Sequence, residues 1–433
     1  GLIVSVDTGI RAAAVVERAN ELGIDVIVTD HHLPETTLPP AVAVLNPNRP
    51  DCSYPDKSLC GAGVAFKLVQ ALLGTLNWPV EKLGRVTESF LKMVAIATVA
   101  DVVPLTGENR IIVKHGLSGL ADVRNPGLRA LLDAAGFAGA RVPSSRQVAF
   151  QIAPRLNAAG RMDTAQAVIE LFLTSNPQRA RELAGQLQRQ NADRQQVETA
   201  IRETCESLAV DPSAAALVYY AEDWHRGVLG IVASRLVERL HRPVFVLSRN
   251  PDDGLAQGSG RSIPAFHLLA ALESMADLFV RFGGHAHAAG VTLETARVDE
   301  FRQRFHECAA ARLLPEDLKP QLAVDGVVEL QEIDERSAAG VFALAPFGHG
   351  NPLPVFAALA VEVAGPPAPW NGKHLRVLLR QNGRTLALKA WNFAERAAEL
   401  PAKARVDAAY SVEEDTYAGG FSVVLRDVRH CGS

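Results

Sequence analysis

The sequence is poor in cysteine, in long apolar runs and in any excess of positive charge. Its five cysteines are odd in number and widely spaced, which excludes a disulfide framework and a zinc site built from paired cysteines. No stretch approaches the roughly 18 apolar residues of a membrane span. We therefore expect a cytoplasmic protein, with reduced cysteines and no membrane partner.

The charge balance limits how the chain can meet nucleic acid. With 44 basic and 48 acidic residues, the formal net charge is −4. Any contact with phosphates would therefore have to come from local clusters of arginine, lysine and histidine, because a uniformly basic surface is excluded.

The first residues already look like the interior of a domain. The chain begins with Gly1 rather than methionine, and residues 2–6 form an apolar run typical of a buried central strand. A natural chain seldom opens on such a strand, so we expect a segment upstream of Gly1 to be missing.

A strand-helix-strand pattern opens the sequence. Residues 2–6, 25–29 and 42–45 are apolar runs, and residues 10–22 between the first two have helical spacing. This order predicts a parallel sheet, in which ligands gather at the carboxyl ends of the strands. Asp7 and Asp30 both follow a strand there.

The rest of the chain predicts a multidomain α/β protein. Helices are expected over residues 63–73, 86–100, 228–240 and 266–280, and strands over 216–220 and 244–247. Five alternating runs, at 356–363, 374–379, 385–390, 406–410 and 421–424, fit a small barrel of the oligonucleotide-binding type. The predicted domains are a parallel-sheet catalytic domain (1–175), a polar connecting helix (176–210), a second α/β domain (211–315) and the barrel (320–433).

The most informative motif is Thr-Asp-His-His at residues 29–32. Adjacent histidines at a strand end project in different directions, so His31 can bind a metal while His32 faces a substrate, and Asp30 can orient an imidazole. Adjacent histidines in a loop can also be plain surface residues.

Asp7 and Asp101 favour the metal interpretation. Asp7 ends the neighbouring strand, and Asp101 follows another apolar segment, although an aspartate before a proline is often a helix-terminus residue. Carboxylates with imidazole suit Mn²⁺ or Mg²⁺ better than zinc. Two such ions, about 3.5 to 4 Å apart, would clamp a phosphodiester and activate water.

Several segments could bind phosphate. Gly283 and Gly284 would let the backbone approach a phosphate to which His285 donates, or they simply form a tight turn. Arg261, beside Gly258 and Gly260, could fork onto a phosphate or lie in a solvated loop.

A further arginine pair stands in a stretch of small residues. Arg155 and Arg161 flank Asn157, and their planar forks suit a nucleic-acid backbone, unless they form a salt bridge with Asp163. His225, before an apolar helix, is a candidate cap and is left outside the catalytic set.

The barrel region mixes cations with aromatic residues, a combination that binds single strands without reading their sequence. We favour Lys373 as the binding residue there, because core packing explains the aromatic residues equally well. The residues concerned are Phe347, Trp370, Lys373, His374 and Trp391.

These motifs resemble the DHH superfamily of phosphoesterases, and within it the RecJ exonuclease family. Residues 6–9 (Val-Asp-Thr-Gly), 29–32 and 100–105 (Ala-Asp-Val-Val-Pro-Leu) are similar to three DHH signatures. Motifs similar to those of RecJ stand at residues 153–161, 259–262 (Ser259 to Ser262), 282–290 and 346–352, the last resembling the segment that opens the RecJ barrel. The resemblance spans nearly the whole chain.

The resemblance implies 5′-to-3′ degradation of single-stranded DNA in repair and recombination, with Mn²⁺ or Mg²⁺ as cofactor. It makes Asp7 a bridging metal ligand, completes one site with His31 and Asp101, and places His32 at the scissile phosphate. It also implies a single-strand-binding protein and a helicase as partners. The family's first signature, an Asp-x-Asp pair, is absent from these residues, so half of the two-metal site is expected from the missing segment.

Two other functions stay open. One is a related phosphoesterase that acts on short oligonucleotides or cyclic dinucleotides, for which a barrel would be unnecessary. The other is a non-catalytic DNA-binding protein, for which the Asp7, His31, His32 and Asp101 set would be unnecessary.

Overall fold

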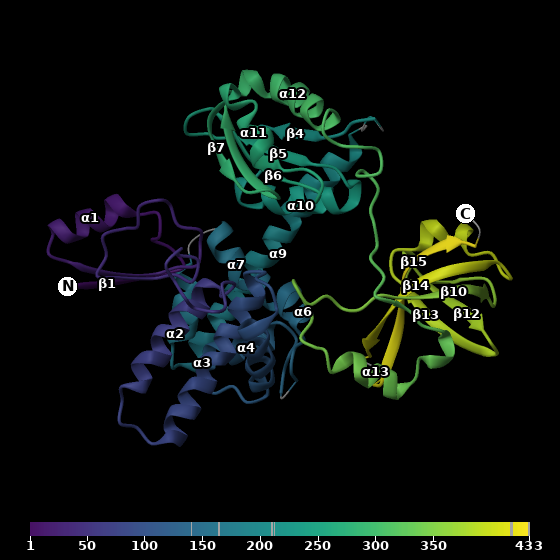
Figure 1. Ribbon diagram of the computed structural model, residues 1–433, viewed down its shortest axis with the longest axis horizontal. Helices are drawn as coiled ribbons and strands as arrows, with labels where there is room; N and C mark the ends of the chain where they lie inside the picture. The colour runs from purple at the N-terminus through teal and green to yellow at the C-terminus, as the bar shows by residue number, and fades with distance from the viewer. Residues whose placement is uncertain (140, 163–164, 209–210, 212, 416–418, 432–433) are drawn as a thin grey trace. The chain divides into compact units, whose positions relative to one another are not determined.

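The computed structural model describes residues 1–139, 141–162, 165–208, 211, 213–415 and 419–431. They form two compact units. One contains residues 1–124, 135–153 and 322–433, and the other contains residues 125–134 and 154–321 (Figure 1).

The chain opens on a parallel sheet, as predicted. Strands β1 (Leu2–Val6), β2 (Asp25–Thr29) and β3 (Ala43–Leu45) pair in that order, all parallel. Helix α1 (Ala13–Glu21) is shorter than the predicted helix, and its buried Val16 and Ala19 pack against apolar residues of β2. The carboxyl ends of β1 and β2 therefore meet at one edge of this sheet.

The prediction that the first strand is buried is wrong for the described chain. β1 is an edge strand, and the exposed fractions of Leu2, Ile3, Val4 and Val6 lie between 43% and 61%. An apolar run predicts a strand from its own residues, whereas burial depends on what packs over it. Among the described strands, only β2 pairs with β1.

Helices follow the sheet. The predicted helices at 63–73 and 86–100 are confirmed as α2 (Gly61–Gly74) and α3 (Val80–Ala100), each extended at its start. The remaining helical segments up to the second sheet are α4 (Gly107–Ser118), the 3-10 helix η1 (Gly119–Ala121), α5 (Pro126–Ala134), α6 (Ser145–Gln147), the π-helical turn η2 (Val148–Ile152), α7 (Ala153–Met162), α8 (Gln166–Leu173) and α9 (Pro177–Ser207).

Helix α9 confirms the predicted long polar helix. Asn176 caps its first turn by accepting the backbone N–H groups of Gln178 and Arg179, and Pro177 suits the first helical position. Its buried side chains recur at helical spacing, and they include Leu183, Leu187 and Ile201.

The second α/β region contains a mixed five-stranded sheet in the order β4-β5-β6-β8-β7. Only β4 and β5 are parallel, and the other pairs are antiparallel. The strands are β4 (Leu217–Ala221), β5 (Val244–Arg249), β6 (Ala256–Arg261), β7 (Phe279–Gly284) and β8 (Ala288–Leu293).

Alternation along β5 explains how helices cover both faces of this sheet. Val244 and Val246 pack with α10 (Leu229–Leu240), whereas Phe245 and Leu247 pack with α11 (Leu268–Glu273) and α12 (Val298–Ala310). Figure 1 shows α10 and α12 on opposite sides of the strands.

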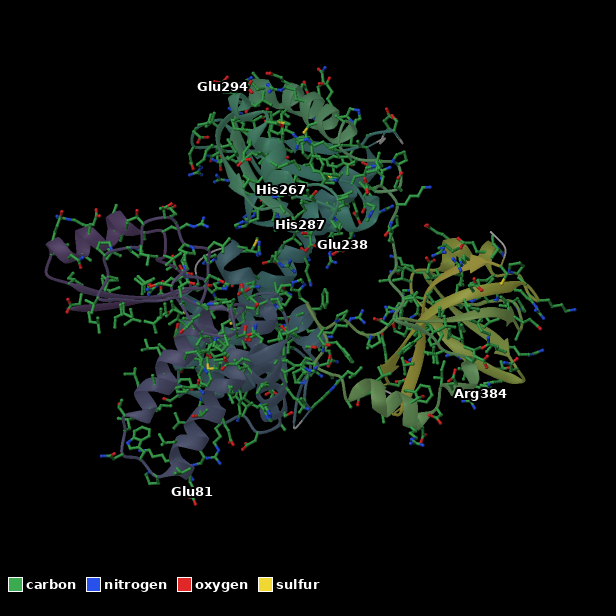
Figure 2. All side chains as sticks on the ribbon, in the orientation of Figure 1. Glu81, Glu238, His267, His287, Glu294 and Arg384 are labelled. Atoms are coloured by element: carbon green, nitrogen blue, oxygen red, sulfur yellow. The ribbon has the colours of Figure 1, made fainter. Side chains whose placement is uncertain are left out.

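The predicted helix over residues 266–280 is wrong in its second half. Helix α11, capped by His267 (Figure 2), ends at Glu273, and β7 begins at Phe279. Phe279 packs into the core from the strand, so tertiary contacts override the helical spacing there.

The C-terminal strands form a closed barrel, as predicted. A sheet in the order β11-β12-β13-β15-β14-β10-β9 is closed by pairing of β12 with β10. The strands are β9 (Gly326–Val327), β10 (Phe356–Val363), β11 (Ala368–Trp370), β12 (His374–Gln381), β13 (Arg384–Ala390), β14 (Arg405–Glu414) and β15 (Phe421–His430), and α13 (Glu335–Phe342) precedes β10. Across the described residues we find no helix with the length and apolar character to cross a membrane.

Candidate functional site

Asp7 stands directly after β1 in a left-handed backbone conformation, with φ of 63°. Its N–H donates to the carbonyl of Thr29 at 3.0 Å, which ties the end of β1 to the end of β2. Its side chain lies against Gly61, the first residue of α2, where a Cβ would stand 2.3 Å from Asp7 Oδ1. Only glycine therefore leaves room for this carboxylate.

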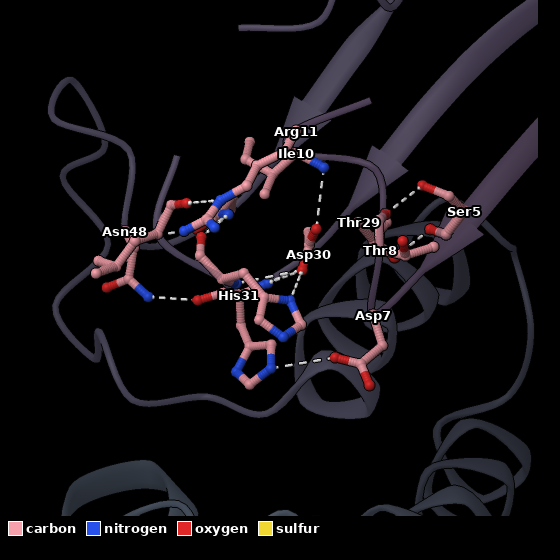
Figure 3. A network of polar contacts seen from close by, with 12 residues as sticks. Ser5, Asp7, Thr8, Ile10, Arg11, Thr29, Asp30, His31 and Asn48 are labelled. Carbon is pink, nitrogen blue, oxygen red and sulfur yellow. Dashed lines mark hydrogen bonds and ion pairs between the residues drawn. The ribbon is translucent and has the colours of Figure 1, made fainter. Parts of the chain in front are cut away.

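Asp30 is buried and organises the histidine pair. Its Oδ1 accepts the backbone N–H groups of His31 and His32, and lies 2.7 Å from His32 Nδ1, while its Oδ2 accepts the N–H of Ile10 (Figure 3). Burial alone would raise the pKa of Asp30, but these hydrogen bonds outweigh it and hold the pKa below its ordinary value. Asp30 is therefore a carboxylate held by four hydrogen bonds, one of them to the His32 ring.

His31 points to the Asp7 carboxylate, with 3.1 Å between Nε2 and Oδ1 (Figure 3). The same nitrogen lies 3.6 Å from Asp101 Oδ2. His32 is close as well, because ligand atoms of Asp7, His31 and His32 all lie within 4.8 Å of one another. Asp7 and Asp101, from two other segments of the chain, thus each have a carboxylate oxygen within 3.6 Å of the same His31 nitrogen.

Asp101 ends α3, which agrees with its reading as a helix-terminus residue, but its side chain also faces His31. Burial raises the pKa of Asp101; His31 opposes this effect and the nearby Asp7 adds to it. The next residue, Val102, has φ of 58°, a conformation that costs a residue other than glycine about 1–3 kcal/mol.

The donor set fits a hard divalent cation. Ligands about 2.1 Å from an octahedral Mg²⁺ stand about 3 Å apart, close to the 3.1 and 3.6 Å separations around His31 Nε2. Carboxylate oxygens with one imidazole are donors that Mn²⁺ and Mg²⁺ accept.

Ser259 and Arg261 lie on β6, beside the start of α10. A Cβ on Gly230, the second residue of α10, would stand 3.0 Å from Arg261 Nη2 and 3.5 Å from Ser259 Oγ. Burial lowers the pKa of Arg261, and the charge of Arg161 lowers it further. Among the described residues neither arginine has an ion pair with a carboxylate; Arg261 donates to the carbonyl of Gly260 and Arg161 to that of Gly227.

The alternative considered for Arg261, a solvated loop, does not hold, because Arg261 ends a strand and is partly buried. Gly283 and Gly284 end β7, and His285 donates its N–H to the carbonyl of Ala288 in the turn to β8 that also contains His287 (Figure 2). The tight turn that we considered is therefore present. Gly283 leaves open space, since no atom lies within 4 Å of a Cβ placed on it.

The predicted arginine pair belongs to helix α7. Burial lowers the pKa of Arg155, which donates to Gln188 Oε1 at 2.6 Å. Arg161 donates to the carbonyl of Gly227 at 3.2 Å. Asn157 is exposed on the same helix. Asp163, the alternative partner, lies outside the described residues.

His225 caps a short helical turn, as the sequence suggested, because its Nδ1 accepts the N–H of Gly227.

In the barrel, aromatic rings form a cluster: the ring centroid of Trp391 lies 4.8 Å from those of both Trp370 and His374. Lys373 stands in the turn between β11 and β12, beside this cluster. Phe347 does not belong to the barrel strands, and its carbonyl accepts the hydroxyl of Ser145.

Three parts of the chain match models of known domain families. Residues 1–98 match the model of the DHH family N-terminal domain, residues 213–311 that of the DHHA1 domain, and residues 324–426 that of the RecJ OB domain.

Curated relatives are similar over most of the chain. Single-stranded-DNA-specific exonuclease RecJ of Escherichia coli is 42% identical over 82% of this chain and 64% of its own length, and that of Bacillus subtilis is 38% identical over 91% and 49%. RecJ of Haemophilus influenzae is 34% identical over 98% of this chain and 76% of its own length. The chain thus spans between about half and two thirds of the first two relatives.

Solved structures show similarity to the same family of exonucleases. A crystal structure of Thermus thermophilus RecJ in complex with Mn²⁺ matches all of this chain and 62% of its own, with a TM-score of 0.84 and 34% identity. A second exonuclease RecJ, bound to manganese, is 39% identical, with a TM-score of 0.61, over 72% of this chain and 76% of its own. With its three domain matches and these relatives, the chain belongs to the RecJ family.

Proposed function

We propose that the chain is a metal-dependent exonuclease that hydrolyses phosphodiester bonds of single-stranded DNA from the 5′ end, in DNA repair and recombination. The observation that carries the proposal is the convergence of Asp7, His31 and Asp101, with 3.1 and 3.6 Å between the imidazole nitrogen and the two carboxylates. The names of the similar relatives supply the substrate class.

Asp7, His31 and Asp101 would hold Mn²⁺ or Mg²⁺. A divalent ion there would lower the pKa of bound water and offset charge on the phosphate. Because Asp30 engages Nδ1 of His32, Nε2 is the nitrogen left to contact the scissile phosphate. A second ion, held in part by an Asp-x-Asp pair, stays a prediction.

Phosphates of the substrate would bind in the second α/β domain. Arg261 has a positive charge and no described carboxylate partner, and Ser259 and the amino end of α10 add hydrogen-bond donors beside it, which favours an anion. Arg155, Asn157 and Arg161 of α7, and the turn at Gly283, Gly284 and His285, are proposed as further contacts with the DNA backbone.

The barrel would hold the strand farther from the cut. Trp391, 41% exposed, and the neighbouring Trp370 and His374 offer ring faces for bases, and Lys373 offers a charge for the backbone. Such contacts read no sequence, as an exonuclease requires.

The proposal also includes protein partners, a cellular location and domain limits. A helicase would supply the single strand and a single-strand-binding protein would present it, and free cysteines suit the cytoplasm. The domain limits at residues 175, 210 and 315 are proposals too.

Single-stranded DNA labelled at either end, incubated with the protein and Mn²⁺, tests the proposal. Loss of the 5′ label as mononucleotide, before loss of the 3′ label and without cleavage of duplex, is expected. Hydrolysis confined to short oligonucleotides or cyclic dinucleotides would favour the related phosphoesterase, and binding without hydrolysis would favour a non-catalytic protein.

A further inference from the structure

A glycine-rich turn precedes the barrel at residues 346–351. Gly348 and Asn351 exchange backbone hydrogen bonds, at 2.9 and 3.2 Å. The side-chain amide of Asn351 also donates to the carbonyls of Leu344 and Pro346, at 3.1 and 2.8 Å. The segment is therefore a turn that its own hydrogen bonds fix, outside the barrel strands.

This turn packs against the loop that follows Asp101. The N–H of Leu105, whose side chain is buried, donates to the carbonyl of His349 at 2.6 Å. A Cβ on Gly348 would stand 2.7 Å from Leu105 Cδ1, and a Cβ on Gly350 would stand 3.0 Å from Pro104 Cβ. Both glycines are thus in closer contact with the loop than larger residues allow.

The loop needs support because of its backbone. Val102, directly after Asp101, is left-handed with φ of 58° and is 66% exposed, so its own side chain does little to hold it. A β-branched residue keeps such a conformation only where its surroundings impose it. The side-chain amide of Asn109 holds the carbonyl of Pro104 at 3.1 Å from within the same segment, and the turn at residues 346–351 covers Pro104 and Leu105.

We propose that residues 346–351 are a brace that positions Asp101 and thereby sets the metal affinity of a site formed by residues distant in the sequence. The residues of the brace are positioning residues, because their described contacts are to the loop after Asp101, to Ser145 and to their own neighbours. This inference rests on the proposed metal centre at Asp7, His31 and Asp101.

The test is Mn²⁺ affinity, measured by calorimetric titration of the full chain with Mn²⁺ alone. Gly350→Ala adds a methyl group against Pro104 at a position with φ of 71°. Gly372→Ala is the matched control, because Gly372 has φ of 70° and nothing within 4 Å of its Cβ position. Both substitutions impose the same backbone strain, but only the first touches the brace.

We expect Gly350→Ala to weaken Mn²⁺ binding about tenfold or more, while Gly372→Ala stays within about twofold of the unsubstituted protein and both lower the metal-free unfolding temperature similarly. Asn351→Ala, which loosens the turn without adding atoms, should weaken binding in the same direction and serves if Gly350→Ala does not fold.

Equal Mn²⁺ affinity of the folded brace variants and the unsubstituted protein would overturn the brace alone. An equal loss in Gly372→Ala would overturn it too, since general destabilisation would then explain the effect. An unsubstituted protein that binds no Mn²⁺ would overturn the metal centre, and the brace with it.

Discussion

Gly61, in the first turn of α2, leaves room for the Asp7 carboxylate, because a Cβ placed on Gly61 would stand 2.3 Å from Asp7 Oδ1. Alanine at position 61 would displace the carboxylate from His31 while favouring the helix, since alanine is the better helix former by up to about 1 kcal/mol. We predict that Gly61→Ala weakens Mn²⁺ binding about tenfold or more in protein that stays folded without metal. Calorimetric titration and thermal unfolding of the same samples check both parts.

Gly63→Ala in the same helix is the control, because its Cβ would make only ordinary contacts of 3.5 Å or more. Equal Mn²⁺ affinities in the two variants would mean that Asp7 does not depend on Gly61.

Metal removal should change stability through the same carboxylate. An ion bound by the native state alone, at 100 times its dissociation constant, adds about 2.7 kcal/mol to the free energy of unfolding. We predict that Mn²⁺ raises the unfolding temperature, that a chelator reverses the rise, and that Asp7→Asn abolishes it. A similar rise in Asp7→Asn would place the ion elsewhere. Asp25→Asn, at the other end of β2, is the control.

His32 is predicted to act in hydrolysis rather than in holding DNA. Asp30 fixes its Nδ1 at 2.7 Å, so removing the ring should lower the rate by about 10²–10⁴-fold, the usual contribution of proton transfer. His32→Ala should bind single-stranded DNA, without metal, about as well as the unsubstituted protein. Single-turnover digestion and binding titrations separate the two. Full turnover by His32→Ala would remove it from the mechanism, and His115→Ala, on an exposed face of α4, controls for histidine loss.

Arg261 is predicted to contact a phosphate. Arg261→Gln should weaken binding and reduce the slope of log affinity against log salt by about 1, since one fewer counterion is released. Titrations with single-stranded DNA at several salt concentrations measure that slope. Arg312→Gln removes the same charge from an exposed position of the same domain and should leave the slope unchanged. Equal slopes in both variants would exclude a phosphate contact at Arg261.

The exposed aromatic and basic side chains of the barrel should affect only the binding of long single-stranded DNA. Trp391→Ala should cost about 1–3 kcal/mol of binding to long single strands, the usual value of one stacked base, and Lys373→Ala should flatten the salt dependence. Cleavage of short oligonucleotides should stay unchanged. Lys403→Ala, which removes another exposed lysine of the barrel, is the control. Slower cleavage of short oligonucleotides by Trp391→Ala or Lys373→Ala would contradict the proposed role of the barrel in binding long strands.

The residues that meet at the candidate metal site could be predicted from the sequence because their signals are local. An apolar strand followed by an aspartate needs no knowledge of the rest of the chain, and parallel pairing then brings Asp7 near His31. The barrel strands were found for the same reason, since alternation is visible along each strand.

Strands β6, β7 and β8 were not predicted, because their sequences are poor in the residues that usually indicate a strand. Glycines at positions 258, 260, 283 and 290 replace the β-branched residues that normally indicate a strand. Close packing explains part of this: a Cβ on Gly260 would stand 2.4 Å from Phe245.

Contacts between distant segments could not be predicted from any local pattern. Gly61 beneath Asp7, and Gly350 against Pro104, are ordinary glycines in the sequence, and only the folded chain shows what each excludes. The exposure of β1 has the same origin, because covering a strand depends on other segments.

In the proposed centre, three side chains hold one divalent ion. A crystal of the protein grown with Mn²⁺, and measured at a wavelength where manganese scatters anomalously, locates that ion directly. We predict an anomalous difference peak within about 2.0–2.4 Å of Asp7, His31 and Asp101 ligand atoms. A map with no peak among these three residues, or with the ion held elsewhere, would contradict the proposed centre.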